Sequence, residues 1–320
     1  MAEGTSLTSP APVRRGRALG WLSVIAFVYV LALWYVDRDK HVLSRLSQLA
    51  APLCGCVVLV LCSYLVRYQR WHTVLRAQGH RVPWRSGLYA YLAGFAFTAS
   101  PGKAGELLRI RYFSRLGVPA SVTLATFIYE RALDLLIIAA LATLAAQLVP
   151  LFGALVGVVL ALVLALFLLA YSRRLQAAAS LVAPSPGVGV RRLAVFLLDG
   201  IRALRPLLRP GLTLGSAAYG SASWLLTSAA FAWLCRAQGI DLTWQHALAI
   251  YPMAMLVGAL SFVPGGVGTT EAAIVLMLAS QGVALDVALT VAIGIRLASL
   301  WLAVAIGMLA MTGLETRAAA

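Results

Sequence analysis

The sequence predicts an all-α polytopic membrane protein with about six full transmembrane helices and two re-entrant half-helices, arranged as two inverted repeats. The first observation is composition: 61% of the 320 residues are hydrophobic and 12% are charged, whereas soluble domains carry about 25% charged residues. The second is length, because several apolar stretches reach the roughly 20 residues that cross a bilayer as a helix. The third is a Pro-Gly passage that occurs twice with matching spacing.

Six apolar stretches have the length of full crossings, and two shorter stretches end in the Pro-Gly passages. The expected crossings are residues 18–36, 49–66, 118–148, 151–172, 211–235 and 283–312. The expected half-helices are residues 86–100 and 247–263, followed by return arms or surface helices at 106–115 and 271–281. A Pro-Gly break at membrane depth exposes backbone groups that lipid cannot satisfy, so it must line a cavity or pack against protein.

The two Pro-Gly passages share a glutamate, a later Gly-Val pair and a later arginine, with identical spacing from the glutamate onward. The first runs Pro101-Gly102-Lys103-Ala104-Gly105-Glu106 and continues to Gly117 and Arg131. The second runs Pro264-Gly265-Gly266-Val267-Gly268-Thr269-Thr270-Glu271 and continues to Gly282 and Arg296. Paired interrupted segments in two halves of a membrane protein indicate the binding site of a transporter.

The basic residues predict the orientation. Twenty of the 26 Lys and Arg residues lie in segments expected on the cytoplasmic side, and four lie in outer loops, as the positive-inside rule requires. This predicts cytoplasmic tails at 1–17 and 313–320 around a single transmembrane domain at 18–312. Within that domain, repeat 1 spans 49–148, a linker helix and basic loop span 151–210, and repeat 2 spans 211–312. The half-helices then enter from opposite sides, which makes the repeats inverted.

The net charge of +15 is interpreted as orientation and contact with anionic lipid headgroups. Nucleic acid is not an expected partner. No metal site and no cofactor are expected, because the four cysteines and four histidines have no zinc-type spacing and no Walker-type loop is present. No catalytic constellation is found, so the chain is not expected to be an enzyme.

Charged residues inside the expected spans are candidate site residues. Glu130, Arg131 and Asp134 lie midway along 118–148, and Arg296 lies in the matching span. Charges at that depth are costly, so they should face a cavity or a partner. Two interpretations stay open: contact with substrate or protons, and a structural ion-pair network. Arg296 has no acidic neighbour in its own helix at the matching positions, so we expect Arg296→Gln to be a cleaner functional test than Arg131→Ala.

The Pro-Gly breaks are candidate anion-binding elements, because glycine-rich turns before a helix present free backbone N–H groups. The candidates are Gly102, Gly105, Gly265, Gly266 and Gly268, with Thr269 and Thr270 as hydroxyl donors or caps. The alternative is a helix break that serves the fold alone. Lys103, Glu106 and the basic and apolar residues through position 115 predict a helix at the cytoplasmic lipid surface that could gather anionic headgroups.

At these residues the sequence resembles a known family. The segments T-A-S-P-G-K-A-G-E-L-L-R, E-R-A-L-D and F-V-P-G-G-V-G-T-T-E-A are similar to the integral-membrane region of bacterial lysylphosphatidylglycerol synthases, in a stand-alone form without the synthase domain. The resemblance implies a flippase of the bacterial inner membrane that carries a polar-headed lipid between leaflets without synthesising it. It also implies a separately encoded lipid-modifying enzyme as a partner.

The expected mechanism holds a lipid headgroup between the two repeats while its tails stay in the bilayer. Arg131, Arg296 and the loop amides would bind the phosphate, and Glu130, Asp134 or Glu271 would receive a cationic group or a proton. Two alternatives remain: a membrane lipid phosphatase of the undecaprenyl-pyrophosphate type, and a non-transporting scaffold of a lipid-modifying complex.

Overall fold

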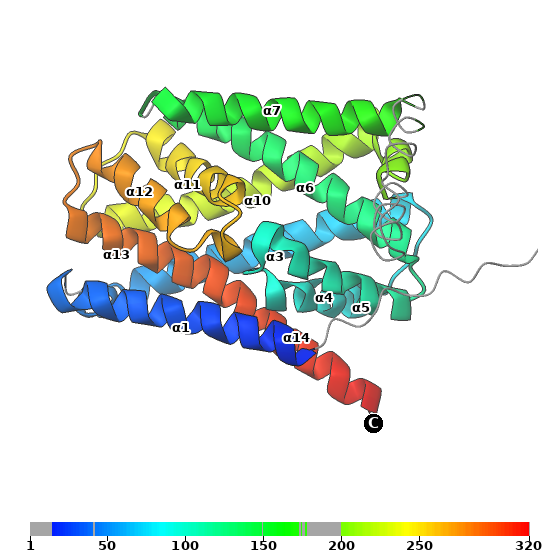
Figure 1. Ribbon diagram of the computed structural model, residues 1–320, viewed down its shortest axis with the longest axis horizontal. Helices are drawn as coiled ribbons and strands as arrows, with labels where there is room; N and C mark the ends of the chain where they lie inside the picture. Colours follow the sequence, from blue (N-terminus) through cyan, green and yellow to red (C-terminus); the bar gives the residue numbers. More distant parts are fainter. Residues whose placement is uncertain are drawn as a thin grey trace, which may run out of the picture.

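Helices joined by short loops make up the residues that the structure describes, which are 15–40, 42–148, 150–172, 174, 177 and 200–319 of a computed structural model (Figure 1). No strand occurs among them. Residues 1–14 of the expected N-terminal tail, most of the expected basic loop and Ala320 lie outside the described residues.

The first half of the chain follows the expected order of elements. It contains α1 (Arg15–Lys40), α2 (Val42–Gln48), α3 (Ala50–Ala77), α4 (Trp84–Ala93), the 3₁₀ helices η1 (Gly94–Phe97) and η2 (Pro101–Leu108), α5 (Arg109–Arg115), α6 (Ala120–Ala142), η3 (Thr143–Leu148) and α7 (Pro150–Tyr171). The expected half-helix 86–100 is thus α4 with a 3₁₀ extension, and it ends before the Pro-Gly passage.

The second half repeats this order. It contains η4 (Arg205–Leu207), α10 (Pro210–Ala237), α11 (Trp244–Leu260), η5 (Pro264–Gly266), α12 (Thr269–Ala279), α13 (Leu285–Arg296), the π-helical turn η6 (Leu297–Trp301) and α14 (Leu302–Ala319). In each half a long helix, a second helix, a Pro-Gly segment, a short helix and a long charged helix follow one another. Neither Pro-Gly segment is part of a straight span.

The repeated Gly-Val pair ends the short helix in each half. Gly117 and Gly282 both have φ near 79°, a left-handed conformation that glycine adopts without strain. The N–H of Val118 bonds to the carbonyl of Phe113, and the N–H of Val283 bonds to the carbonyl of Leu278. This pattern is the Schellman helix end, so the conserved spacing within the chain reflects the same turn made twice.

Within the described residues, three helices are long and apolar enough to cross a membrane: Ala50–Ala77, Phe152–Tyr171 and Leu285–Thr316. They correspond to three of the six expected crossings. The other three expected crossings are helical in α1, α6 and α10, and their passage through the bilayer stays a prediction. The protein is therefore an all-helical membrane protein.

The two halves pack against each other along their length. The most extensive helix pairing among the described elements joins α3 to α10, and α11 packs against α6. Helix α14 crosses α4 and η1, where Gly307 touches the backbone of Phe95 and Ala96. In Figure 1, α7 and α1 lie along opposite edges of the bundle, so the interior is formed by the elements between them.

Candidate functional site

A small cavity of about 80 Å³ lies where the two halves meet. Its lining includes residues from α3, α6, α10, α11 and α13 together with both Pro-Gly segments. Its charged and polar side chains are Arg67, Glu106, Arg131, Arg296, Thr98, Thr227, Tyr64, Tyr251 and Ser299. Segments η2 and η5 also contact each other here. Residues of both Pro-Gly segments thus line one cavity, while the depth of this cavity in the membrane stays a prediction.

The carboxylates of α6 are held by arginines from α3. Arg70 donates to Glu130 Oε1 at 2.9 Å and to Asp134 Oδ1 at 2.8 Å. Arg67 donates to Asp134 Oδ2 at 3.0 Å and stacks on the ring of Trp224. Tyr91 on α4 donates its hydroxyl to Glu130 at 2.9 Å. Because all these groups are buried, each carboxylate depends on its partners for solvation.

Glu106 and Arg109 were both expected in a helix on the lipid surface, and that expectation is wrong for both residues. Both side chains are 1% exposed, and Arg109 is one of the largest fully buried side chains in the described part of the chain. It forms ion pairs with Glu106 at 3.2 Å and Glu130 at 3.5 Å, and its guanidinium lies 3.9 Å from the ring centroid of Tyr91. The ion pairs and the aromatic ring replace the water that a surface arginine would have.

Arg131 has the most exposed side chain of the three arginines that line the cavity. Its Nη2 lies 3.1 Å from Asp134 Oδ2 and 3.6 Å from Glu130 Oε2. Its side chain is 20% exposed, and its Nε has no hydrogen-bond partner within the described residues. Because Arg131 lines the cavity and part of its side chain is exposed there, an anion in the cavity could contact the guanidinium while both carboxylates keep their arginines from α3.

Arg296 is instead fully engaged in holding the second Pro-Gly segment. Its Nε donates to Glu271 Oε1 at 3.0 Å, and its Nη2 donates to the carbonyl of Gly265 at 2.5 Å. Glu271 in turn accepts the N–H of Gly268 at 2.8 Å through its other oxygen. The Arg296 side chain, which is 1% exposed, therefore holds the turn at Gly265–Gly268 in place both directly and through Glu271.

This arrangement reverses the expected contrast between the two arginines. Without Arg131, Glu130 and Asp134 keep the arginines of α3 as partners. Without Arg296, Glu271 loses the one cation that pairs with it in the described part of the chain. The partner comes from α12 and not from the helix of Arg296, which is why neighbours in the sequence did not reveal it. Arg131 is therefore the cleaner functional test.

Several glycine amides of the breaks already have partners. The N–H of Gly105 bonds to Ser100 Oγ at 2.6 Å, and the N–H of Gly266 bonds to the carbonyl of Val263. With Gly268 held by Glu271, these three amides must be released before they can bind a phosphate. Their role as anion ligands stays a prediction.

The threonines of the second break differ from each other. Thr269 Oγ1 lies 3.0 Å from Ser261 Oγ and donates to the carbonyl of Gly266 at 3.2 Å. Thr270 is buried, and its Oγ1 has no hydrogen-bond partner among the described residues. Gly102 belongs to η2, while the side chain of Lys103 lies outside what the structure describes.

The described charges around the cavity sum to one net positive charge. The carboxylates are Glu106, Glu130, Asp134 and Glu271, and the arginines are Arg67, Arg70, Arg109, Arg131 and Arg296. Among the described residues no group of three His, Cys, Asp or Glu side chains could hold a metal ion. The arrangement suits an anionic or phosphate-bearing group more than a cation.

The sequence matches the family described as the lysylphosphatidylglycerol synthase TM region over residues 19–307. The chain belongs to this family. No curated protein matches it. Membership covers almost the whole chain and indicates a role connected with membrane lipids.

The sequence did not predict three of the arginines that pair with the buried carboxylates around the cavity. Arg67 and Arg70 were counted among the cytoplasmic basic residues because the expected span ended at residue 66, and Arg109 because it belonged to the expected surface helix. Helix α3 in fact continues to Ala77 and carries Arg67 and Arg70 into the interior. The aromatic residues between and after them, Tyr68 and Trp71, are buried and were the available signal that this turn faces protein.

Proposed function

We propose that the chain translocates a polar-headed, phosphate-containing lipid between the leaflets of the bacterial inner membrane. The observation that carries this proposal is the cavity between the halves, which holds buried arginines from both and one net positive charge. A charged group inside a membrane domain is costly unless it serves a partner or a ligand. The phosphate group of a phospholipid is an anion that every phospholipid bilayer contains.

The proposal includes an architecture of two inverted repeats with re-entrant Pro-Gly segments and with both chain ends in the cytoplasm. The matching order of elements and the contact between η2 and η5 support it. A cysteine placed at Gln78 should be protected from a membrane-impermeant thiol reagent added outside intact cells, and one at Gln238 should react. The two positions end equivalent helices, α3 and α10, so labelling of both from one side contradicts the inversion.

In the proposed mechanism, Arg131 binds the phosphate and Arg296 holds the second break in shape. A cavity of about 80 Å³ accommodates a few water molecules, and a lipid headgroup needs more room. The halves therefore separate to admit the headgroup while the tails stay in lipid, and they rock to alternate access. Glu130 and Asp134 are paired with the arginines of α3, so these pairs must open before either carboxylate can receive a cationic part of the headgroup or a proton.

The test uses proteoliposomes with fluorescent phosphatidylglycerol as the probe and external dithionite as the quencher of outer-leaflet dye. Arg131→Gln should slow translocation at least tenfold because it removes the net positive charge of the cavity. Arg236→Gln is the matched control, since Arg236 is an exposed arginine at the far end of α10. Equal rates for wild type and Arg131→Gln would remove Arg131 from the proposed site.

We also propose that the chain breaks no covalent bond and works beside a separately encoded lipid-modifying enzyme. The same vesicles test this. Phosphate release from a pyrophosphate-bearing lipid would favour the phosphatase alternative. Absence of protein-dependent translocation for anionic and zwitterionic probes alike would favour a scaffold.

A further inference from the structure

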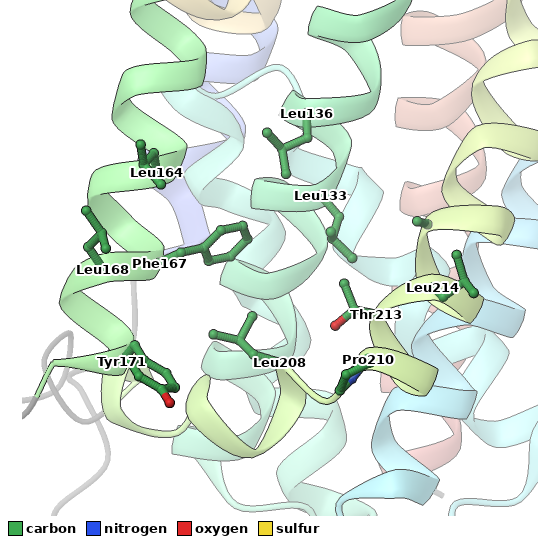
Figure 2. Close-up of a pocket in the computed structure, with 11 residues that line it drawn as sticks. Leu133, Leu136, Leu164, Phe167, Leu168, Tyr171, Leu208, Pro210, Thr213 and Leu214 are labelled. Atoms are coloured by element: carbon green, nitrogen blue, oxygen red, sulfur yellow. The ribbon is translucent and has the colours of Figure 1, made fainter.

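A second, larger hollow lies away from the charged cavity, on the other side of α6. Its volume is about 570 Å³, which is within the range of ligand pockets. Leu133 of α6, Phe167 and Leu168 of α7 and Leu214 of α10 line it, as Figure 2 shows. Every lining residue except Tyr171 and Thr213 is apolar.

The position of α7 means that this groove opens to the bilayer. Residues Phe152–Tyr171 form one of the three helices with the length and hydropathy of a membrane span. Helix α7 lies at the edge of the bundle in Figure 1, and Leu168 and Leu214 are exposed. At membrane depth such an apolar groove is occupied by hydrocarbon.

One end of the groove is basic. Tyr171 ends α7 and lines the groove, and the guanidinium of Arg205 lies 5.5 Å from the centroid of its ring. Arg209 is exposed and directly precedes Pro210, the first residue of α10, which also lines the groove. Residues 200–240 contain no Asp or Glu.

These features match the two parts of a phospholipid. A tyrosine at the end of a span marks the level of the headgroups, and basic pockets between transmembrane helices at that level bind anionic headgroups. The positive N-terminal end of α10 adds to the two arginines. The apolar part of the groove, beyond the two arginines, receives an acyl chain.

We propose that the α6–α7–α10 groove is a binding site for an anionic phospholipid, with an acyl chain in the groove and the phosphate at Arg205 and Arg209. The site lies apart from the cavity that contains Arg131, so it does not depend on the proposed translocation. The bound lipid is a resident ligand that covers this face of α6.

Native mass spectrometry of the protein released from nanodiscs of equal phosphatidylglycerol and phosphatidylcholine tests the headgroup. The wild-type protein should retain more phosphatidylglycerol than phosphatidylcholine. Arg205→Gln should lower that preference about fivefold and Arg205→Gln/Arg209→Gln about 25-fold, following about 1 kcal/mol for each basic residue near anionic lipid. Arg236→Gln, at the other end of α10, should change nothing.

The acyl-chain part is tested by filling the groove. Leu214→Trp should reduce retention of both lipids, while Leu309→Trp should not, because Leu214 and Leu309 are 75% and 73% exposed but Leu309 lies on α14 outside the groove. The proposal is overturned if the Arg205/Arg209 variant keeps the wild-type preference or if Arg236→Gln loses it equally. A dimer that Leu214→Trp dissociates would also overturn it, since a second copy would then occupy the groove.

Discussion

Arg296→Gln should destabilise the protein more than Arg131→Gln, although the two arginines occupy equivalent places in the repeated sequence. The Arg296 substitution removes the 3.0 Å bond to Glu271 Oε1 and the bond to the carbonyl of Gly265. It leaves a buried carboxylate that has lost its paired cation and keeps the bond from the N–H of Gly268.

The expected loss in the free energy of unfolding follows from the unpaired charge of Glu271. Breaking a buried ion pair by removing one partner costs about 3–5 kcal/mol, and the bond from Gly268 places this case at the lower end, about 3 kcal/mol. Arg131→Gln should cost about 1–2 kcal/mol, because Asp134 keeps its bonds to two arginines of α3. The expected difference in unfolding free energy is therefore about 1–2 kcal/mol, and 1.4 kcal/mol corresponds to about a factor of ten in the unfolding equilibrium.

The assay is reversible unfolding in mixed micelles, as a double-mutant cycle with Glu271→Gln. The neutral pair Arg296→Gln/Glu271→Gln should recover about 2 kcal/mol relative to the single arginine variant, because no charge is left buried. Additive effects of the two substitutions, or a larger loss for Arg131→Gln than for Arg296→Gln, would refute the reasoning.

Two further substitutions test the packing around the site. Tyr91→Phe removes the hydroxyl that bonds to Glu130 at 2.9 Å. It should lower the free energy of unfolding by about 1.5 kcal/mol in the same assay, as expected for a hydrogen bond to a charged group. A decrease below about 0.5 kcal/mol would contradict that contact. Gly307→Ala should destabilise by about 1–3 kcal/mol, since the added methyl group meets the backbone of η1. Gly313→Ala in the same helix has no neighbour within 4 Å and should be neutral or stabilising, so equal losses for the two glycines would refute the close approach.

Much of the secondary structure could be predicted because it depends on short-range features. Apolar runs of sufficient length predicted the helices, and Pro-Gly dipeptides predicted the interruptions at η2 and η5. The identical spacing of the two passages predicted equivalent turns at Gly117 and Gly282, which the structure has. Ends of helices were less accurate, since α3 continues eleven residues beyond the expected span.

What the sequence by itself determined is the class of protein, the order of its helices, the position of its breaks and its membership of the family. Tertiary structure alone decided which charges pair. Arg70 bonds to acids 60 and 64 residues away, and Arg296 to one 25 residues away. Helical periodicity relates residues within a turn or two, whereas these partners meet only after the helices pack. A buried arginine is stabilised by whichever acid the packing brings to it, so the roles of Arg131 and Arg296 diverge although their positions in the repeat are the same.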